Sequence, residues 1–188
     1  PQVASAVVAG GCVACASALR LRGAWVPESL GRGHVRAARR NDEWRPAGCR
    51  AYGSAPPVSS AIDDVETAFR CLLRCGSSED VVVIADSLLH LGLATRDDLT
   101  AWCAGAPIRT RALMATVDLA ESGTESMTRI RLRRRRVRVR PQVWIGRRRV
   151  DLLVGDILVI ECDGAEHHAS WQAHSADRER DRALAADG

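Results

Sequence analysis

The stretch Val150-Asp-Leu-Leu-Val-Gly-Asp-Ile-Leu-Val-Ile-Glu-Cys-Asp-Gly164 decides the expected fold. It consists of two apolar runs rich in β-branched residues, joined by a Gly-Asp pair that is typical of a turn. Asp156 belongs to that turn, whereas Asp151, Glu161 and Asp163 lie within or at the ends of the apolar runs. Because an ionised carboxylate is costly to bury unless it is paired or binds a cation, the pattern indicates a divalent-metal site on a β-hairpin.

The length of the turn decides whether these acids can share one ion. Side chains alternate between the faces of a sheet, so a two-residue loop would put Asp151 and Glu161 on opposite faces. A three-residue loop over 154–156 pairs Leu153 with Ile157 and makes the two acids diagonal neighbours on one face, about 7–8 Å apart. We therefore predict a loop with an odd number of residues, or an equivalent bulge.

A basic segment precedes the hairpin. Residues 129–149 contain eleven arginines and no acid. So many like charges indicate a surface for a polyanion, although a solvated face is the alternative. Aromatic residues make up 4% of the chain, so contact with a duplex backbone is favoured over base stacking. The candidate DNA-binding residues are Arg133, Arg134, Arg135, Arg136, Arg138 and Arg140.

Length and composition set the broad class. The 188 residues suffice for two small domains, which we place at residues 1–118 and 119–188. The seven cysteines are an odd number, and no apolar run approaches the roughly 20 residues of a membrane span, so a reducing cytoplasm without membrane contact is expected. The first residue is Pro, which predicts that the chain begins inside a longer protein. All basic residues are Arg and none is Lys, a bias that also fits a GC-rich coding sequence.

Periodicity predicts the order of helices and strands. The pattern of a helical hairpin around the turn at residues 91–94 could also form a DNA-reading helix-turn-helix, but no cluster of Arg decorates its second helix. From residue 137 the hydrophobic period changes to two, which predicts a three-strand meander turning at Gly146. Helices are expected over 5–22, 60–75, 80–91, 95–102, from 122 onward, and over 171–186.

Several motifs in the last third of the chain occur in a characteristic order: Ser122-Gly-Thr-Glu-Ser126, Pro141-Gln142, Val150-Asp151, Ile160-Glu-Cys-Asp-Gly164 and His167-His168. Residues 120–188 thereby resemble the Vsr-like endonuclease domains of the PD-(D/E)XK superfamily. The region before them resembles the domain of the AbiEi antitoxin family that often precedes such nuclease domains.

The resemblance implies an α/β protein with a restriction-endonuclease-like mixed sheet flanked by helices, preceded by a mainly helical α+β domain. Asp151 and Glu161 would bind Mg²⁺, or Mn²⁺, with Glu125 reaching in from the first helix. In the superfamily a Lys follows the second acid by two residues, and Asp163 occupies that position here. His167 or His168 is then the candidate for proton transfer. A further core strand is expected beyond residue 188.

Other readings remain open at this level. Glu125 could simply complement a helix N-terminus, and the two histidines could be exposed residues at the start of a helix. Cys12-x-x-Cys15 has the spacing of half a zinc site, but no second pair follows at a fitting distance, so zinc is not expected. The rival to a DNA endonuclease is a non-catalytic DNA-binding or antitoxin-like bacterial regulator, whose N-terminal domain binds a protein partner or an operator.

Overall fold

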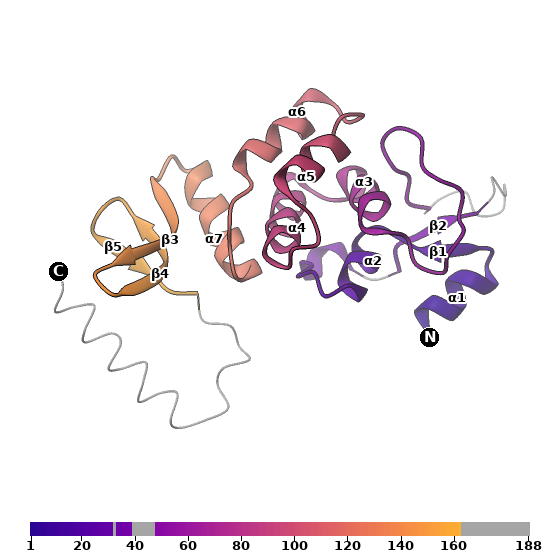
Figure 1. The fold of residues 1–188 in the computed structure, drawn as a ribbon, viewed down its shortest axis with the longest axis horizontal. Coiled ribbons are helices and arrows are strands. Elements are labelled where there is room, and N and C mark those ends of the chain that lie inside the picture. The colour runs from indigo at the N-terminus through magenta and orange to yellow at the C-terminus, as the bar shows by residue number, and fades with distance from the viewer. Residues whose placement is uncertain (32, 39–47, 163–188) are drawn as a thin grey trace, which may run out of the picture. The chain divides into compact units, whose positions relative to one another are not determined.

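The computed structural model describes residues 1–31, 33–38 and 48–162. It divides the chain into two compact units, Pro1–Gly123 and Thr124–Gly188, whereas the sequence suggested a boundary after residue 118. In the described part each unit combines helices with a small antiparallel sheet, so the chain is a mixed α/β protein, as predicted (Figure 1). None of the described helices is both long and apolar enough to cross a lipid bilayer.

The first predicted helix, over residues 5–22, is wrong. The segment instead forms helix α1 (Gln2–Val8), strand β1 (Gly11–Val13) and helix α2 (Cys15–Leu21). Gly10 has φ +74, a conformation that ends a helix, and a Cβ on Gly11 would collide with the Arg36 carbonyl oxygen. The close approach arises because β1 pairs antiparallel with β2 (Val35–Ala37), a partner more than twenty residues away.

The other helices predicted in unit 1 are confirmed, with shifts at their ends. Thr95 and Ser77 each form a capping box with the Asp three residues later, and Asp64 caps the helix that follows it. The helices predicted over 80–91 and 95–102 begin within two residues of their predicted starts, whereas the helix predicted over 60–75 begins five residues later, at Val65. The elements are η1 (Glu28–Leu30), α3 (Val65–Cys75), α4 (Ser78–His90), α5 (Arg96–Trp102), α6 (Ile108–Arg111) and η3 (Ala112–Thr116).

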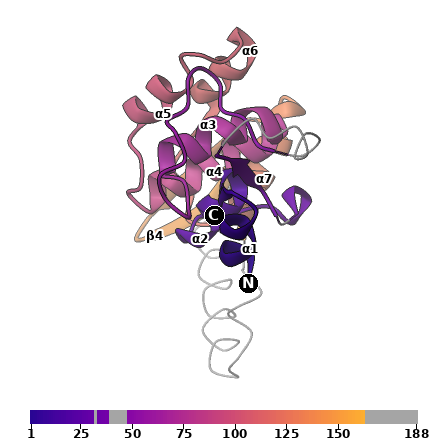
Figure 2. The ribbon, with the colours of Figure 1, turned by 90° about the vertical axis from the view of Figure 1, so that its right-hand side faces the viewer.

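The core of unit 1 lies among α2, α3 and α4, which gather together in Figure 2. Their largest fully buried apolar side chains are Leu19, Phe69, Leu72, Ile84 and Leu88. The ring of Phe69 also meets that of Trp102 on α5, with centroids 6.0 Å apart and planes tilted by 55°. The apolar stripes that periodicity predicted are therefore the surfaces on which the helices pack.

A buried ion pair joins the small sheet to the start of α3. The Arg36 guanidinium on β2 donates from Nε to Asp63 Oδ2 at 2.9 Å and from Nη2 to Oδ1 at 2.5 Å. The side chains are 11% and 5% exposed. The Cys12 thiol donates to the same carboxylate at 3.3 Å. The backbone supports this junction, since Asp63 N donates to Val13 O at 2.9 Å.

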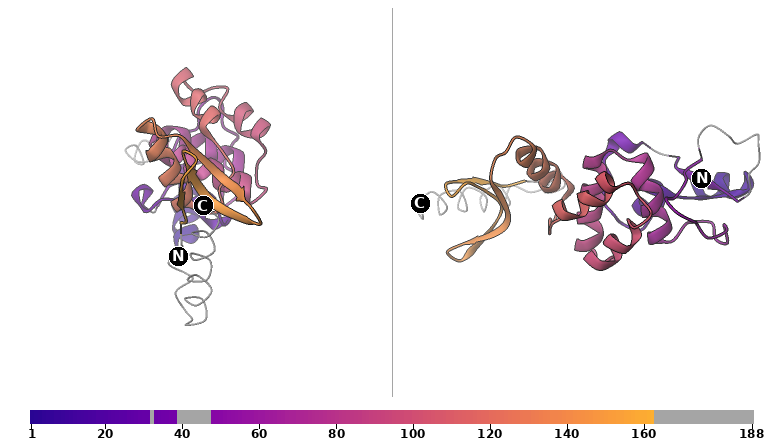
Figure 3. Two further views of the ribbon diagram at one scale, coloured as in Figure 1. Left: turned by 90° about the vertical axis from the view of Figure 1, so that its left-hand side faces the viewer. Right: turned by 90° about the horizontal axis from the view of Figure 1, so that it is seen from above.

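Unit 2 has the predicted order of a helix followed by a three-strand meander. Its elements are α7 (Gly123–Arg134), β3 (Val139–Ile145), β4 (Arg148–Val154) and β5 (Leu158–Ile160). The sheet order is β3-β4-β5 and all pairs are antiparallel (Figure 3). Its buried apolar residues are Ile130, Val139, Val150, Leu152 and Leu153. The helix expected over 171–186 lies outside the described residues.

Candidate functional site

The hairpin of β4 and β5 brings Asp151 and Glu161 together. Its loop has three residues, Gly155 to Ile157, so the prediction of an odd loop is confirmed. The predicted register is wrong by two positions, because Leu153 pairs with Val159 and not with Ile157. The last pair of the hairpin is Leu152 with Ile160. If the same register is continued by one residue, Asp151 lies opposite Glu161. Directly opposite residues point to the same face and lie closer than diagonal neighbours.

Hydrogen bonds hold the two acids at the end of the hairpin. The Asp151 carboxylate accepts from Cys162 N at 2.8 Å, and Glu161 Oε2 accepts from Asp151 N at 3.3 Å. Each side chain therefore reaches across to the other strand. Both acids are half-buried, so the site combines fixed carboxylates with access from solvent.

Strand β3 places a further polar side chain, Gln142, beside Asp151. The pairs Pro141–Leu152 and Val143–Val150 bracket Gln142 and Asp151, so these two residues face each other across β3 and β4. Gln142 has φ +52, a left-handed conformation that is costly for a residue other than glycine and frequent at functional sites. Its amide Nε2 donates to Glu125 Oε1 at 2.8 Å. The sheet thus links Asp151 to the acid on α7.

Glu125 lies in the first turn of α7 and is 1% exposed. Arg129, one helical turn later on the same face, is 0% exposed. The alternative that Glu125 serves only the helix N-terminus does not explain its hydrogen bond to a side chain of β3. The Glu125–Gln142 bond and the proximity of Cys162 Sγ to Thr128 Oγ1, at 4.0 Å, both tie α7 to the sheet.

The acids of unit 2 are residue types that can bind a hard divalent cation, but the one group of converging ligand atoms among the described residues lies in unit 1. Asp151, Glu161 and Glu125 offer carboxylate oxygens, which are the ligands that Mg²⁺ and Mn²⁺ prefer in proteins. Burial also raises the pKa of the neighbouring Cys162 thiol, which keeps the sulfur protonated. Asp163 and His167, the other two residues expected here, lie outside the described residues, as does His168.

The candidate DNA-binding arginines are solvent-exposed. Arg133, Arg134, Arg135, Arg136, Arg138 and Arg140 extend from the end of α7 into β3, and all six are exposed. Arg133 Nη2 donates to the Val139 carbonyl oxygen on β3 at 3.1 Å, and Arg140 forms an exposed ion pair with Asp156 at 2.8 Å. Such exposed pairs contribute little to stability, so Arg140 can exchange its partner for a phosphate.

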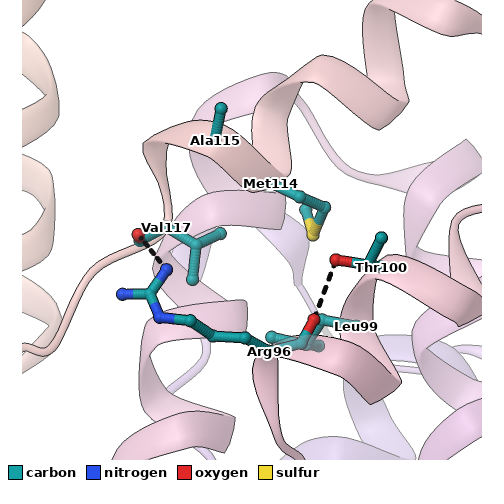
Figure 4. A pocket seen from close by; sticks show the side chains of 6 residues that line it. All are labelled: Arg96, Leu99, Thr100, Met114, Ala115 and Val117. Carbon is teal, nitrogen blue, oxygen red and sulfur yellow. Dashed lines mark hydrogen bonds between the residues drawn. The ribbon is translucent and has the colours of Figure 1, made fainter.

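Unit 1 contains a surface pocket of about 330 Å³ between α5 and η3 (Figure 4). It is lined by Arg96, Leu99, Thr100, Met114, Ala115 and Val117. Its one charged side chain, Arg96, donates to the Val117 carbonyl oxygen at 2.9 Å. The lining contains no carboxylate, and its one hydroxyl, Thr100 Oγ1, donates to the Arg96 carbonyl oxygen of its own helix at 2.8 Å, so the pocket does not compete with the acids of unit 2 as a catalytic site.

Sequence reasoning missed a second group of potential metal ligands. Cys15, His34, Cys49 and Cys75 converge in unit 1, and their ligand atoms all lie within 4.8 Å of one another. The Cys12-x-x-Cys15 spacing pointed to only one of the four, and Cys12 belongs instead to the Asp63 junction. No short motif could have found the other three, because they are spread along the chain as far as position 75.

Comparison of the chain with protein-family models, with curated proteins and with solved structures finds no match. The function therefore has to be inferred from the site itself.

Proposed function

We propose that residues 124–188 form a metal-dependent DNA endonuclease domain with a restriction-endonuclease-like arrangement. The observation that carries the proposal is the pair of hydrogen bonds by which the Asp151 and Glu161 carboxylates reach across to each other's strand at the end of the β4–β5 hairpin. Two half-buried acids facing each other at a strand end are costly to keep ionised unless a cation is shared between them.

The proposed reaction is hydrolysis of a phosphodiester bond. Asp151 and Glu161 would hold one Mg²⁺ or Mn²⁺, which when bound supplies an activated water and neutralises charge on the phosphate. Glu125, positioned by Gln142, adds negative charge from α7 and helps to retain the cation. Hydrolysis would form a P–O bond to the water oxygen and break the P–O bond to the leaving oxygen, while the water loses a proton and the leaving oxygen gains one. We assign that proton transfer to His167, with Asp163 as a further acid near the cation.

The exposed arginines on the end of α7 and on β3 would bind the DNA duplex through its phosphates. Each phosphate contact releases condensed counterions, so affinity should fall steeply with salt and depend little on sequence. Replacing Arg133 to Arg136 by Ser should lower the slope of log K against log salt by up to about 3.6, if each contacts one phosphate. The exposed pair Arg109 and Arg111 on α6, replaced by Ser, serves as a control outside the proposed surface.

A non-catalytic DNA-binding regulator is the second candidate function. The observation that favours it is the absence of Lys from the sequence, since the superfamily's motif position holds Asp163. A regulator would retain the arginine surface and the fold but would have no need of a cation at Asp151. Cation binding therefore distinguishes the two candidates.

The test combines plasmid nicking with thermal shift in Mg²⁺ and Mn²⁺. Asp151→Asn and Glu161→Gln should each remove most cleavage and abolish the cation-induced rise in Tm, because each deletes a ligand charge at constant size. Asp156→Asn, an exposed acid in the turn of the same hairpin, is the matched control and should keep both properties. If wild type and the two site variants bind DNA equally, cleave equally poorly and show no cation response, the regulator replaces the endonuclease.

A further inference from the structure

The four converging side chains of unit 1 come from four separate segments. Cys15 is the first residue of α2, His34 immediately precedes β2, Cys49 lies in the segment beyond β2, and Cys75 is the last residue of α3. Two of these segments are already joined by the β1–β2 sheet, in which Ala14 N donates to His34 O at 2.9 Å. Cys49 N in turn donates to Val35 O at 2.7 Å. The backbone therefore holds Cys15, His34 and Cys49 in place.

Two of the distances between ligand atoms match the edges of a zinc tetrahedron. Bond lengths of about 2.3 Å for Zn–S and about 2.05 Å for Zn–N give tetrahedral edges of about 3.8 Å for S···S and about 3.5 Å for S···N. In the structure Cys75 Sγ lies 3.7 Å from Cys49 Sγ, and Cys49 Sγ lies 3.4 Å from His34 Nδ1. A disulfide would require about 2.05 Å between the two sulfurs, so Cys49 and Cys75 are free thiols.

The orientation of His34 provides an independent indication of a metal. Its Nε2 lies 2.7 Å from the Leu30 carbonyl oxygen, which can only accept, so Nε2 carries the proton. Nδ1 is then unprotonated in the neutral ring, with its lone pair directed toward Cys49 Sγ. A histidine that binds a metal typically donates its other N–H to a backbone carbonyl or a carboxylate in this way.

The backbone at Cys15 is consistent with a fixed ligand position. Cys15 has φ +51 and is 0% exposed, so a residue other than glycine is kept in the left-handed region inside the core. Such a conformation costs of order 1–3 kcal/mol and persists where the surroundings determine it. Cys75, in contrast, is exposed and leaves a path by which an ion can enter.

We propose that Cys15, His34, Cys49 and Cys75 bind one Zn²⁺ ion that joins α2, β2 and α3 in the N-terminal unit. Three thiolates and one imidazole form a closed set of four protein ligands, which is typical of a structural zinc site without a position for substrate. The ion would connect residues from 15 to 75 and so stabilise a region whose described sheet has two strands of three residues each. The site is separate from the proposed endonuclease, and its test does not involve DNA cleavage.

The test measures zinc in the whole chain, purified under reducing conditions without chelator. We expect one zinc per chain by elemental analysis, and tetrahedral Co²⁺–thiolate absorption after exchange with cobalt. Cys75→Ser should lose the stoichiometric zinc. Cys12→Ser is the matched control and should keep it, because Cys12 shares the Cys-x-x-Cys spacing but contacts Asp63 instead of the cluster, where a Ser hydroxyl can also donate.

Wild type provides a second measurement in case Cys75→Ser does not fold. A strong chelator should lower its Tm, and added Zn²⁺ should restore it. The proposal is overturned if wild type carries no zinc and its Tm is insensitive to chelator and to Zn²⁺. It is also overturned if Cys12→Ser loses zinc while Cys75→Ser keeps it, or if mass spectrometry finds a Cys49–Cys75 disulfide in the reduced preparation.

Discussion

The substitution Asp63→Asn tests how much of the stability of unit 1 depends on its buried ion pair. The Asp63 carboxylate is 5% exposed and accepts two hydrogen bonds from the Arg36 guanidinium and one from the Cys12 thiol. Asn keeps the size of the side chain but removes its charge and turns an amide N–H toward a group that can only donate. Arg36, itself 11% exposed, is then a buried charge without its counter-ion.

Breaking such a pair by removal of one partner costs about 3–5 kcal/mol, because the remaining charge stays desolvated. This is a large part of the roughly 5–15 kcal/mol by which a domain is stable. It corresponds to a fall in Tm of roughly 10–20 °C for a unit of this size. The matched control is Glu66→Gln, which breaks the Arg70–Glu66 pair at 3.3 Å on α3, where Glu66 is 49% exposed. That exposed pair should contribute no more than about 0.5 kcal/mol.

Urea denaturation followed by far-UV circular dichroism measures both variants, with zinc held at saturation. The double variant Asp63→Asn, Arg36→Gln removes the uncompensated charge, so it should be more stable than Asp63→Asn alone and give a favourable coupling energy for the pair. If Asp63→Asn is as stable as Glu66→Gln, or if the double variant loses the sum of the two single losses, the buried pair does not act as argued.

Three further predictions concern single positions. Gly123→Ala should lower stability by about 1–3 kcal/mol, since a Cβ there would overlap the Trp25 ring, whereas Gly48→Ala, with open space around it, should change little in the same denaturation assay. Arg136→Gly should stabilise the chain by about 1 kcal/mol, because Arg136 ends α7 with φ +60, and a loss of stability would contradict this reading. Burial raises the pKa of Cys103 from 9.0 to about 11, so the folded state retains the thiol proton, and stability present below pH 9 is lost as pH rises toward 11. Under reducing conditions Cys103→Ala should therefore show a smaller fall in Tm between pH 9 and 11 than wild type, and equal falls would refute it.

The sequence by itself determined the elements whose stability is local. The helices α3, α4 and α5 follow from an apolar period near 3.6 and from capping residues such as Ser77 and Thr95, which act within one turn. The β3–β5 meander follows from the change to a period of two and from glycines at the turns. The sequence also predicted an odd number of residues in the β4–β5 loop. An odd loop puts Asp151 and Glu161 on the same face of the hairpin, because side chains alternate between the two faces.

Only the tertiary structure decided features that depend on distant partners. Residues 11–13 lie inside the small, apolar stretch 5–22 that predicted one helix, but they form β1, because β2 offers them strand hydrogen bonds. The register of the hairpin, with Leu153 opposite Val159, depends on packing that parity cannot specify. The convergence of Cys15 with Cys75 requires the sheet, α2 and α3 to assemble first. Ligands so far apart in the sequence have no characteristic spacing. Their sulfur and nitrogen atoms come within reach of one ion because the folded chain brings distant segments together.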